Sequence, residues 1–240
     1  MLVKNQIIVL SKLKYSENDL IIKAYTKQRG TVSYMLRGVL KSKKNNSKSI
    51  YYQLLSQLDI EENFNPKREL QYIKEVKFTF IYKSLHHQIL KSTIVMFLSE
   101  VLSYALKEEE QNEDLFQFIT SSLQFLDHLD HSFSNFHLLF LVQLSQYLGI
   151  KPHQSNKNAH IFNLQTGDFE NYISNKYSAS EYNSKLLIYF FNSDYEQIGQ
   201  LKISSIQRQD FLNMLLTYFE LHLEGFRKPK SLNILNTVFS

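Results

Sequence analysis

The sequence predicts a multi-domain α+β fold, with five short strands over residues 1–80 forming a small closed barrel or sandwich and an all-α domain over residues 81–240. Two observations lead to this prediction. Up to about residue 80, apolar and β-branched residues alternate or form short runs between turn residues, whereas from about Leu85 they recur at helical spacing. The charge changes as well, because residues 1–80 carry 15 Lys+Arg against 7 Asp+Glu and residues 81–240 carry 12 against 16. A basic β module joined to a mildly acidic helical module is therefore expected.

The strands are expected in five short segments. The third shows the clearest alternation, with Val32, Tyr34 and Leu36 on one face. Turn residues separate the segments, notably Gly30, which can adopt a positive φ, and Pro66. The expected strands cover residues 7–13, 19–26, 31–39, 50–62 and 69–80.

The second part of the chain is expected to contain five amphipathic or buried helices, over residues 85–110, 113–129, 133–148, 180–191 and 204–223. Gly149 is placed to end the third of them. Residues 151–177 are polar and irregular, with a short hairpin expected around Thr166–Gly167. The last residues are expected to be extended and docked by Leu232, Ile234 and Leu235.

Composition and motifs exclude several classes of function. The chain has no cysteine, so disulfides, thiolate metal sites and cysteine nucleophiles are ruled out. No phosphate-binding glycine loop, nucleophile elbow or zinc-protease motif occurs. His86 and His87 are adjacent on a helix and point in different directions, so they do not share a metal. We expect a non-catalytic protein without metal or cofactor, and without signal peptide or membrane span, in the cytoplasm and associated with the nucleoid.

The N-terminal charge predicts an interaction with nucleic acid. Residues 1–48 carry 11 Lys+Arg against 2 Asp+Glu, and several cations on one rigid surface are what phosphate binding requires. Tyr15 and Tyr34, if exposed, could add stacking. The alternative for any single lysine is a solubilising surface. The expected DNA-binding residues are Lys12, Lys14, Arg29, Arg37, Lys41, Lys43, Lys44 and Lys48, with Arg37 anchored on a strand and residues 41–48 forming a flexible electrostatic arm.

Three stretches together resemble one family. The first is "IIVLSKLKYSENDLIIKAYTKQRGTVSYMLRGVLKSKKNNS", the second is "LSQYLGIKP" and the third is "FNLQTGDF". Their content and order resemble the bacterial RecO recombination mediators. The resemblance is dense over residues 7–45 and thin elsewhere.

The resemblance implies a five-stranded OB-fold barrel over residues 1–80 that binds nucleic acid, followed by a helical domain. It implies binding of single- and double-stranded DNA, annealing of complementary strands and, with RecR, loading of RecA on DNA coated by the single-strand-binding protein. The C-terminal tail of the single-strand-binding protein is an implied partner, although its pocket cannot be placed on residues here. Arg29, Arg37 and the lysines after Gly38 match the family's basic positions.

One departure from the family concerns zinc. Many RecO proteins hold zinc with four cysteines between the Leu-Gly-ended helix and the later helices, and this chain has none. His153 and His160 alone do not make a closed tetrahedral site. A short metal-free insertion near residues 150–177 is expected instead, stabilised by packing of Phe162, Phe169 and Tyr172.

Two other functions remain open at this stage. The chain could be a protein-interaction scaffold whose helical domain is the main binding surface and whose basic loop is only solvated. An enzyme with a scattered active site has no positive motif in the sequence.

Overall fold

The computed structural model describes residues 2–40, 46–106, 111–156 and 158–240. The chain divides into two compact units, Met1–His128 and Leu129–Ser240. The first unit contains all six strands of the main sheet together with helices α2 (Ile89–Ala105) and α3 (Glu113–His128). The domain boundary expected after residue 80 coincides with the end of β6, inside this unit, and stays a prediction.

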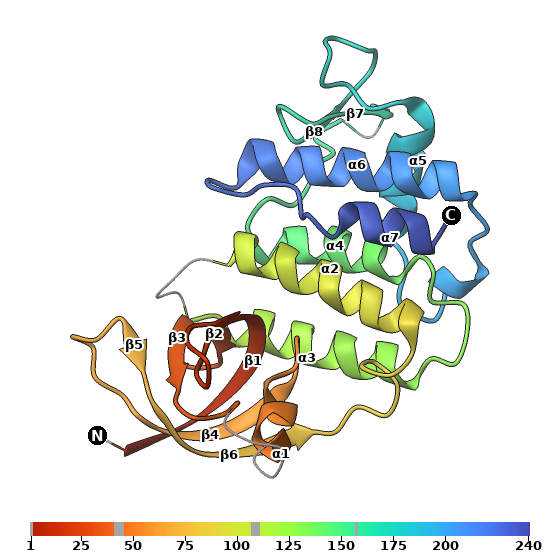
Figure 1. Cartoon of the computed structure of the whole chain (residues 1–240). Helices are drawn as coiled ribbons and strands as arrows, with labels where there is room; N and C mark the ends of the chain where they lie inside the picture. Colours follow the sequence, from red (N-terminus) through yellow and green to blue (C-terminus); the bar gives the residue numbers. More distant parts are fainter. Residues whose placement is uncertain (1, 41–45, 107–110, 157) are drawn as a thin grey trace. The chain divides into compact units, whose positions relative to one another are not determined.

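The main sheet is curled and OB-like, so the α+β prediction is confirmed (Figure 1). Its order is β5-β3-β2-β1-β4-β6, antiparallel except where β5 pairs with β3. The long β1 strand pairs with β4 through residues 2–8 and with β2 through residues 7–14. A register shift between Val9 and Ser11 forms a bulge that bends this strand. The strands are β1 (Leu2–Lys14), β2 (Leu20–Thr26), β3 (Gly30–Leu36), β4 (Gln57–Asn63), β5 (Leu70–Gln71) and β6 (Ile73–Phe80).

The fourth expected strand is shorter than predicted. Residues 46–52 form α1 (Asn46–Ser49) and the 3-10 helix η1 (Ile50–Tyr52), and β4 begins only at Gln57. The reason lies in two adjacent tyrosines. Tyr52 is buried in the barrel core and Tyr51 packs against the same core, with its ring 4.6 Å from that of Phe78. Successive side chains of a strand point to opposite faces, whereas a helical turn lets both rings contact the core.

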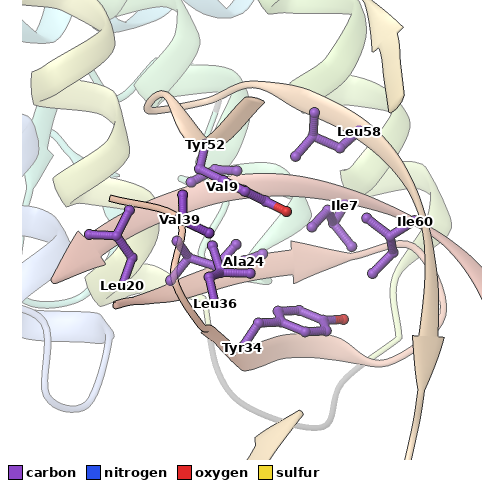
Figure 2. Close-up of a cluster of buried hydrophobic side chains, with 11 residues drawn as sticks. Ile7, Val9, Leu20, Ala24, Tyr34, Leu36, Val39, Tyr52, Leu58 and Ile60 are labelled. Atoms are coloured by element: carbon purple, nitrogen blue, oxygen red, sulfur yellow. The ribbon is translucent and has the colours of Figure 1, made fainter. Parts of the chain in front are cut away.

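The core of the barrel is formed by alternate residues of the strands, which point toward one another in Figure 2. Tyr34 belongs to this core and is 0% exposed. The expectation that Tyr34 stacks on nucleic acid is therefore wrong, since the same alternation that places Leu36 inside places Tyr34 beside it. Tyr15 is 63% exposed, as that expectation required. The core residues are Ile7, Val9, Leu20, Ile22, Ala24, Tyr34, Leu36, Val39, Tyr52, Leu58 and Ile60.

Part of the outer face of the barrel is covered by α2 and α3. Ile8 and Leu10, which alternate with the core residues of β1, are 0% and 1% exposed. Lys23 Nζ donates to the Ser103 carbonyl at 3.4 Å, and the Tyr25 hydroxyl donates to the Asn112 carbonyl at 3.2 Å. The outer face of β2 is thus in contact with the residues that end α2 and precede α3.

The segment between β6 and α2 is anchored on the end of α3 by Asp127. Its carboxylate accepts the backbone N–H groups of Lys83, Ser84 and Leu85 at 2.9, 2.7 and 3.0 Å. The buried Lys91 donates to the Ser84 hydroxyl at 2.7 Å and to the Asp127 carbonyl at 3.0 Å. Burial alone would raise the pKa of Asp127, but the backbone N–H groups outweigh it and hold the pKa below its ordinary value.

The second unit contains α4 (Phe136–Tyr147), α5 (Glu181–Phe191), η2 (Ile198–Gln200), α6 (Ser205–His222) and α7 (Leu232–Val238). Gly149 follows α4 with a φ of +73°, as its predicted capping role requires. The prediction of an extended C-terminal tail is wrong over α7. This segment is a helix that buries Leu235 and leaves Ile234 49% exposed. Only one side of a helix faces the core, so Ile234 is not a docking residue.

The expected hairpin is confirmed as β7 (Ile161–Asn163) and β8 (Asp168–Glu170). Phe162 is fully buried, and its ring lies 5.3 Å from that of Phe169 and 5.2 Å from that of Tyr218 on α6. Tyr172 is 72% exposed, so its predicted packing role is wrong. The third aromatic contact comes instead from Tyr218, more than 40 residues further along the chain.

The described residues contain neither a metal-binding cluster nor a membrane-spanning helix. No group of three or more His, Asp or Glu side chains among them is placed to hold a metal ion. In the same ranges, no helix has the length and apolarity needed to cross a membrane.

We predict that Asp127→Ala lowers the free energy of unfolding at pH 7 by about 3 kcal/mol, because three N–H groups, two of them buried, lose their acceptor. The folded pKa of Asp127 is depressed, so its contribution is fully present above the unfolded pKa of about 3.9 and is lost as the pH falls through the lower folded value. The difference between variant and wild type in urea unfolding should therefore shrink below about pH 4. Asp130→Ala, at an exposed position, is the matched control; equal losses in both variants would contradict this role.

Candidate nucleic-acid interface

One end of the barrel gathers several of the predicted cations. Lys14 lies opposite Leu20, and Leu20 lies opposite Leu36, so Lys14 and Arg37 belong to the same end of the sheet. The hairpin between β1 and β2 is also tied to the turn after β3. Asp19 accepts the Gly38 N–H at 2.7 Å, and the Leu40 N–H donates to the Asn18 carbonyl at 2.9 Å. Leu40, the last described residue before the basic loop, therefore lies beside this hairpin.

Lys12 and Lys14 are exposed on the end of β1 that extends past the barrel core. Lys12 pairs with Ile22 and Lys14 with Leu20, so both lysines lie on the side of the sheet that faces the mouth of the barrel. Near Lys12, burial lowers the pKa of His86. The hydrogen bond of His86 with the Leu54 carbonyl acts in the opposite direction, and the charge of Lys12 lowers the pKa slightly further. The imidazole of His86 is thus neutral at pH 7 and adds no charge to this end.

Arg37 is exposed and directly follows β3, in a turn and not on the strand as predicted. The turn forms because Gly38 adopts a φ of +67°, in the left-handed region that favours glycine. Its guanidinium reaches the side chain of Tyr72, with Nη2 3.4 Å from the tyrosine hydroxyl and the guanidinium carbon 5.5 Å from the ring centroid. Arg37 is therefore oriented toward another loop of the barrel.

The basic loop is described only at its end. Lys48 is exposed in the last turn of α1. Lys41, Lys43 and Lys44 lie outside the described residues, so their predicted role is not tested by the structure.

Arg29 lies at the opposite end of β3 from Arg37. The strand has 7 residues, which separates its ends by about 20 Å. The guanidinium of Arg29 forms an ion pair with Glu62, whose side chain is 0% exposed, and lies 4.0 Å from the centroid of the Phe64 ring. Burial raises the pKa of Tyr34 far above its usual value, and the neighbouring Glu62 carboxylate raises it further. Arg29 thus neutralises a buried carboxylate at the end of β3 away from Arg37, and its predicted contact with DNA stays a prediction.

Two residues absent from the sequence prediction, Arg68 and Tyr72, also lie at the basic end of the barrel. Arg68 is exposed in the turn before β5, and its guanidinium carbon lies 5.8 Å from the centroid of the Tyr72 ring. The parallel pairing of β5 with β3 brings this turn toward the end of β3. The signal in the sequence is the basic turn around Pro66 followed by a tyrosine, a pattern that by itself indicates only a turn.

The described cations at this end have no ion-pair partner among the described carboxylates. Among the described residues, no carboxylate forms an ion pair with Lys12, Lys14, Arg37, Lys48 or Arg68. Glu17, Asp19 and Glu69 are the acidic residues of the same loops, so the local balance remains positive.

A groove of about 720 Å³ elsewhere in the first unit has the opposite character. Its lining contains three lysines and four carboxylates, and each lysine is paired: Lys4 with Glu61 at 3.5 Å, Lys27 with Glu113 at 2.8 Å and Lys77 with Asp59 at 3.6 Å. Compensated charge of this kind does not attract a polyanion. The two surfaces therefore differ in the pairing of their cations, not in the number of cations alone.

Comparisons with known proteins identify relatives over the full length of the chain. The family model described as "Recombination protein O N terminal" matches residues 1–82, and the one described as "Recombination protein O C terminal" matches residues 86–232. The DNA repair protein RecO of Christiangramia forsetii is 47% identical over 239 residues, and that of Flavobacterium johnsoniae is 39% identical over 240. The protein of the same name from Bacteroides fragilis is 32% identical over 243 residues. Each match covers 100% of both chains.

We predict that Arg29→Met lowers the free energy of unfolding by about 3–5 kcal/mol, because it leaves the buried Glu62 carboxylate without its charge partner. The double variant Arg29→Met/Glu62→Leu should recover much of the loss, since neither charge remains to be desolvated. Urea denaturation followed by circular dichroism measures both. A fully stable single variant would contradict a structural role for this ion pair.

Proposed function

Since the chain belongs to the RecO family of DNA repair proteins, we propose that it binds single- and double-stranded DNA and anneals complementary strands. With RecR, it helps to load RecA on DNA coated by the single-strand-binding protein. Family membership by itself assigns a role in DNA repair and recombination. The finer steps form the proposal. The observation that supports them best is the set of cations at one end of the barrel that form no ion pair with any described carboxylate.

Binding follows from the charge arrangement. A cation that already pairs with a carboxylate must break that pair before it can neutralise a phosphate, whereas Lys14, Arg37 and Arg68 need not. Each phosphate that they neutralise releases condensed counterions, which drives association at low salt. We propose that the lysines of residues 41–48 contribute as well, because Leu40, which precedes them, lies at this end of the barrel and Lys48 is exposed.

Annealing follows from the same property. Two complementary strands are polyanions that repel each other, and a surface that neutralises phosphates lowers the cost of bringing them together. Contacts to the backbone leave the base edges free to pair. This role needs no bond-breaking chemistry, so we propose a binding protein and not an enzyme.

We assign the proposed protein contacts, with RecR and with the C-terminal tail of the single-strand-binding protein, to no particular residues. The competing proposal is a protein-interaction scaffold in which the helices carry the function and the basic loop is solvated. DNA-binding measurements on loop variants separate the two.

We predict that the wild-type protein binds a fluorescent single-stranded oligonucleotide with an affinity that falls steeply as salt rises, measured by anisotropy at several salt concentrations. The logarithm of the binding constant should decrease by about 0.7 per neutralised phosphate for each unit of log salt. Absence of binding at low salt, or binding independent of salt, would contradict the proposed DNA contact.

Replacing Lys41, Lys43, Lys44 and Lys48 together by Gln should weaken binding about tenfold at low salt and reduce the salt slope by about 3, because four phosphate contacts are removed. The matched control replaces four exposed lysines of the second unit, Lys151, Lys176, Lys202 and Lys230, by Gln. Equal effects of the two quadruple variants, or no effect of either, would favour the scaffold.

We predict that the protein accelerates annealing of complementary dye-labelled strands, followed by energy transfer between the dyes. The quadruple loop variant should anneal more slowly at limiting protein, because fewer phosphates are neutralised. An unchanged annealing rate in a variant with weakened binding would argue against charge neutralisation as the mechanism.

A further inference from the structure

Tyr72 has two arginines close to its ring. The guanidinium carbons of Arg37 and Arg68 lie 5.5 and 5.8 Å from the ring centroid. Both arginines are exposed, and Tyr72 itself is half-buried. The three side chains come from two loops, the turn after β3 and the segment that surrounds β5.

A second arginine–aromatic pair in the same unit shows what a structural contact looks like here. Arg29 lies 4.0 Å from the centroid of the Phe64 ring, and its charge is neutralised by Glu62. Arg37 and Arg68 are more distant from their ring, and neither has a carboxylate partner among the described residues. Both arginines therefore keep an uncompensated charge beside a ring that is only half-buried.

The backbone around Tyr72 is held in place before any ligand binds. Gln71 is 2% exposed, and its side-chain amide donates to the carbonyls of Asn65 and Arg68 at 2.8 and 2.7 Å while accepting the Asn65 N–H at 2.9 Å. The Tyr72 carbonyl accepts the Asn63 N–H at 3.2 Å. A preorganised site loses less conformational entropy when a ligand binds.

We propose that Tyr72 stacks on one unpaired base of a single strand, while Arg37 and Arg68 contact the flanking phosphates. This inference rests on the proposed function and names the site at which the protein distinguishes single-stranded from double-stranded DNA. Stacking needs an exposed base face, which a single strand offers and a paired duplex does not. Because every base has such a face, the site is tolerant of sequence.

The test compares Tyr72→Leu with wild type on an oligothymidylate of about 15 nucleotides and on a hairpin-capped duplex of equal length. Removal of the ring should weaken single-strand binding about tenfold and leave duplex binding within about twofold, because stacking contributes only to the single strand. Tyr172→Leu, a change at an exposed tyrosine of the second unit, is the matched control and should leave both affinities unchanged.

Salt dependence separates the ring from its arginines. Arg68→Gln should reduce the salt slope for single strands by about 0.7, since one phosphate contact is lost. Tyr72→Leu should lower the affinity with an unchanged slope, because a stacked base releases no counterion. A slope that changes equally in both variants would overturn the division of roles.

A direct readout is photocrosslinking with a single 5-iodouracil in the same oligonucleotide, with the attached residue mapped by mass spectrometry. The expected crosslink is on Tyr72, and it should be absent in Tyr72→Leu. If wild type binds both DNA forms but Tyr72→Leu binds the single strand normally and the crosslink lies elsewhere, this inference fails while the proposed function stands. If wild type binds neither form, the proposed function itself fails.

Discussion

The sharing of β1 between two neighbours is the constraint on which the rest of the first unit depends. One strand pairs with β4 along its first half and with β2 along its second, and the bulge between Val9 and Ser11 allows it to bend between them. Because of this curl, Ile7 and Val9 face the core of the barrel, while Ile8 and Leu10 face outward and are buried as well. The inner face of β1 forms part of the barrel core, and its outer face packs against the helices. The loops at the end of the sheet are therefore held by a rigid support.

The same unit uses its cations in two ways, and the difference is decided by the acids around them. Arg29 is held by the buried Glu62 and by Phe64, and three lysines of the polar groove are each paired with a carboxylate. At the other end of the sheet the basic side chains have no such partner among the described residues. A surface cation without a partner produces a positive potential in the surrounding solvent, whereas an adjacent carboxylate cancels most of that potential. The potential that attracts a polyanion therefore depends on which cations remain free.

The hairpin of the second unit shows how a short insertion is stabilised by packing in a chain without cysteine. Phe162 lies between Phe169 and Tyr218, and its backbone is fixed by hydrogen bonds with Ser184 and Ala179 at 2.9 and 2.7 Å. The Tyr218 hydroxyl also donates to the Ile150 carbonyl at 2.8 Å. Aromatic rings bury a large area for few rotatable bonds, so three of them suffice to hold a small hairpin on a helix.

The sequence by itself determined the fold class, the turn glycines, the positions of most strands and those of helices α2 to α6, because these depend on local periodicity and backbone preference. It also indicated the basic character of residues 1–80, of which Lys14 and Arg37 are exposed members. Only the tertiary structure decided which cations are free. The pairing of Arg29 with Glu62, the position of Arg68 beside Tyr72 and the helical form of residues 232–238 all depend on contacts between segments far apart in the chain or on packing against them. Such contacts have no period in the sequence, so the composition of a basic region cannot reveal them.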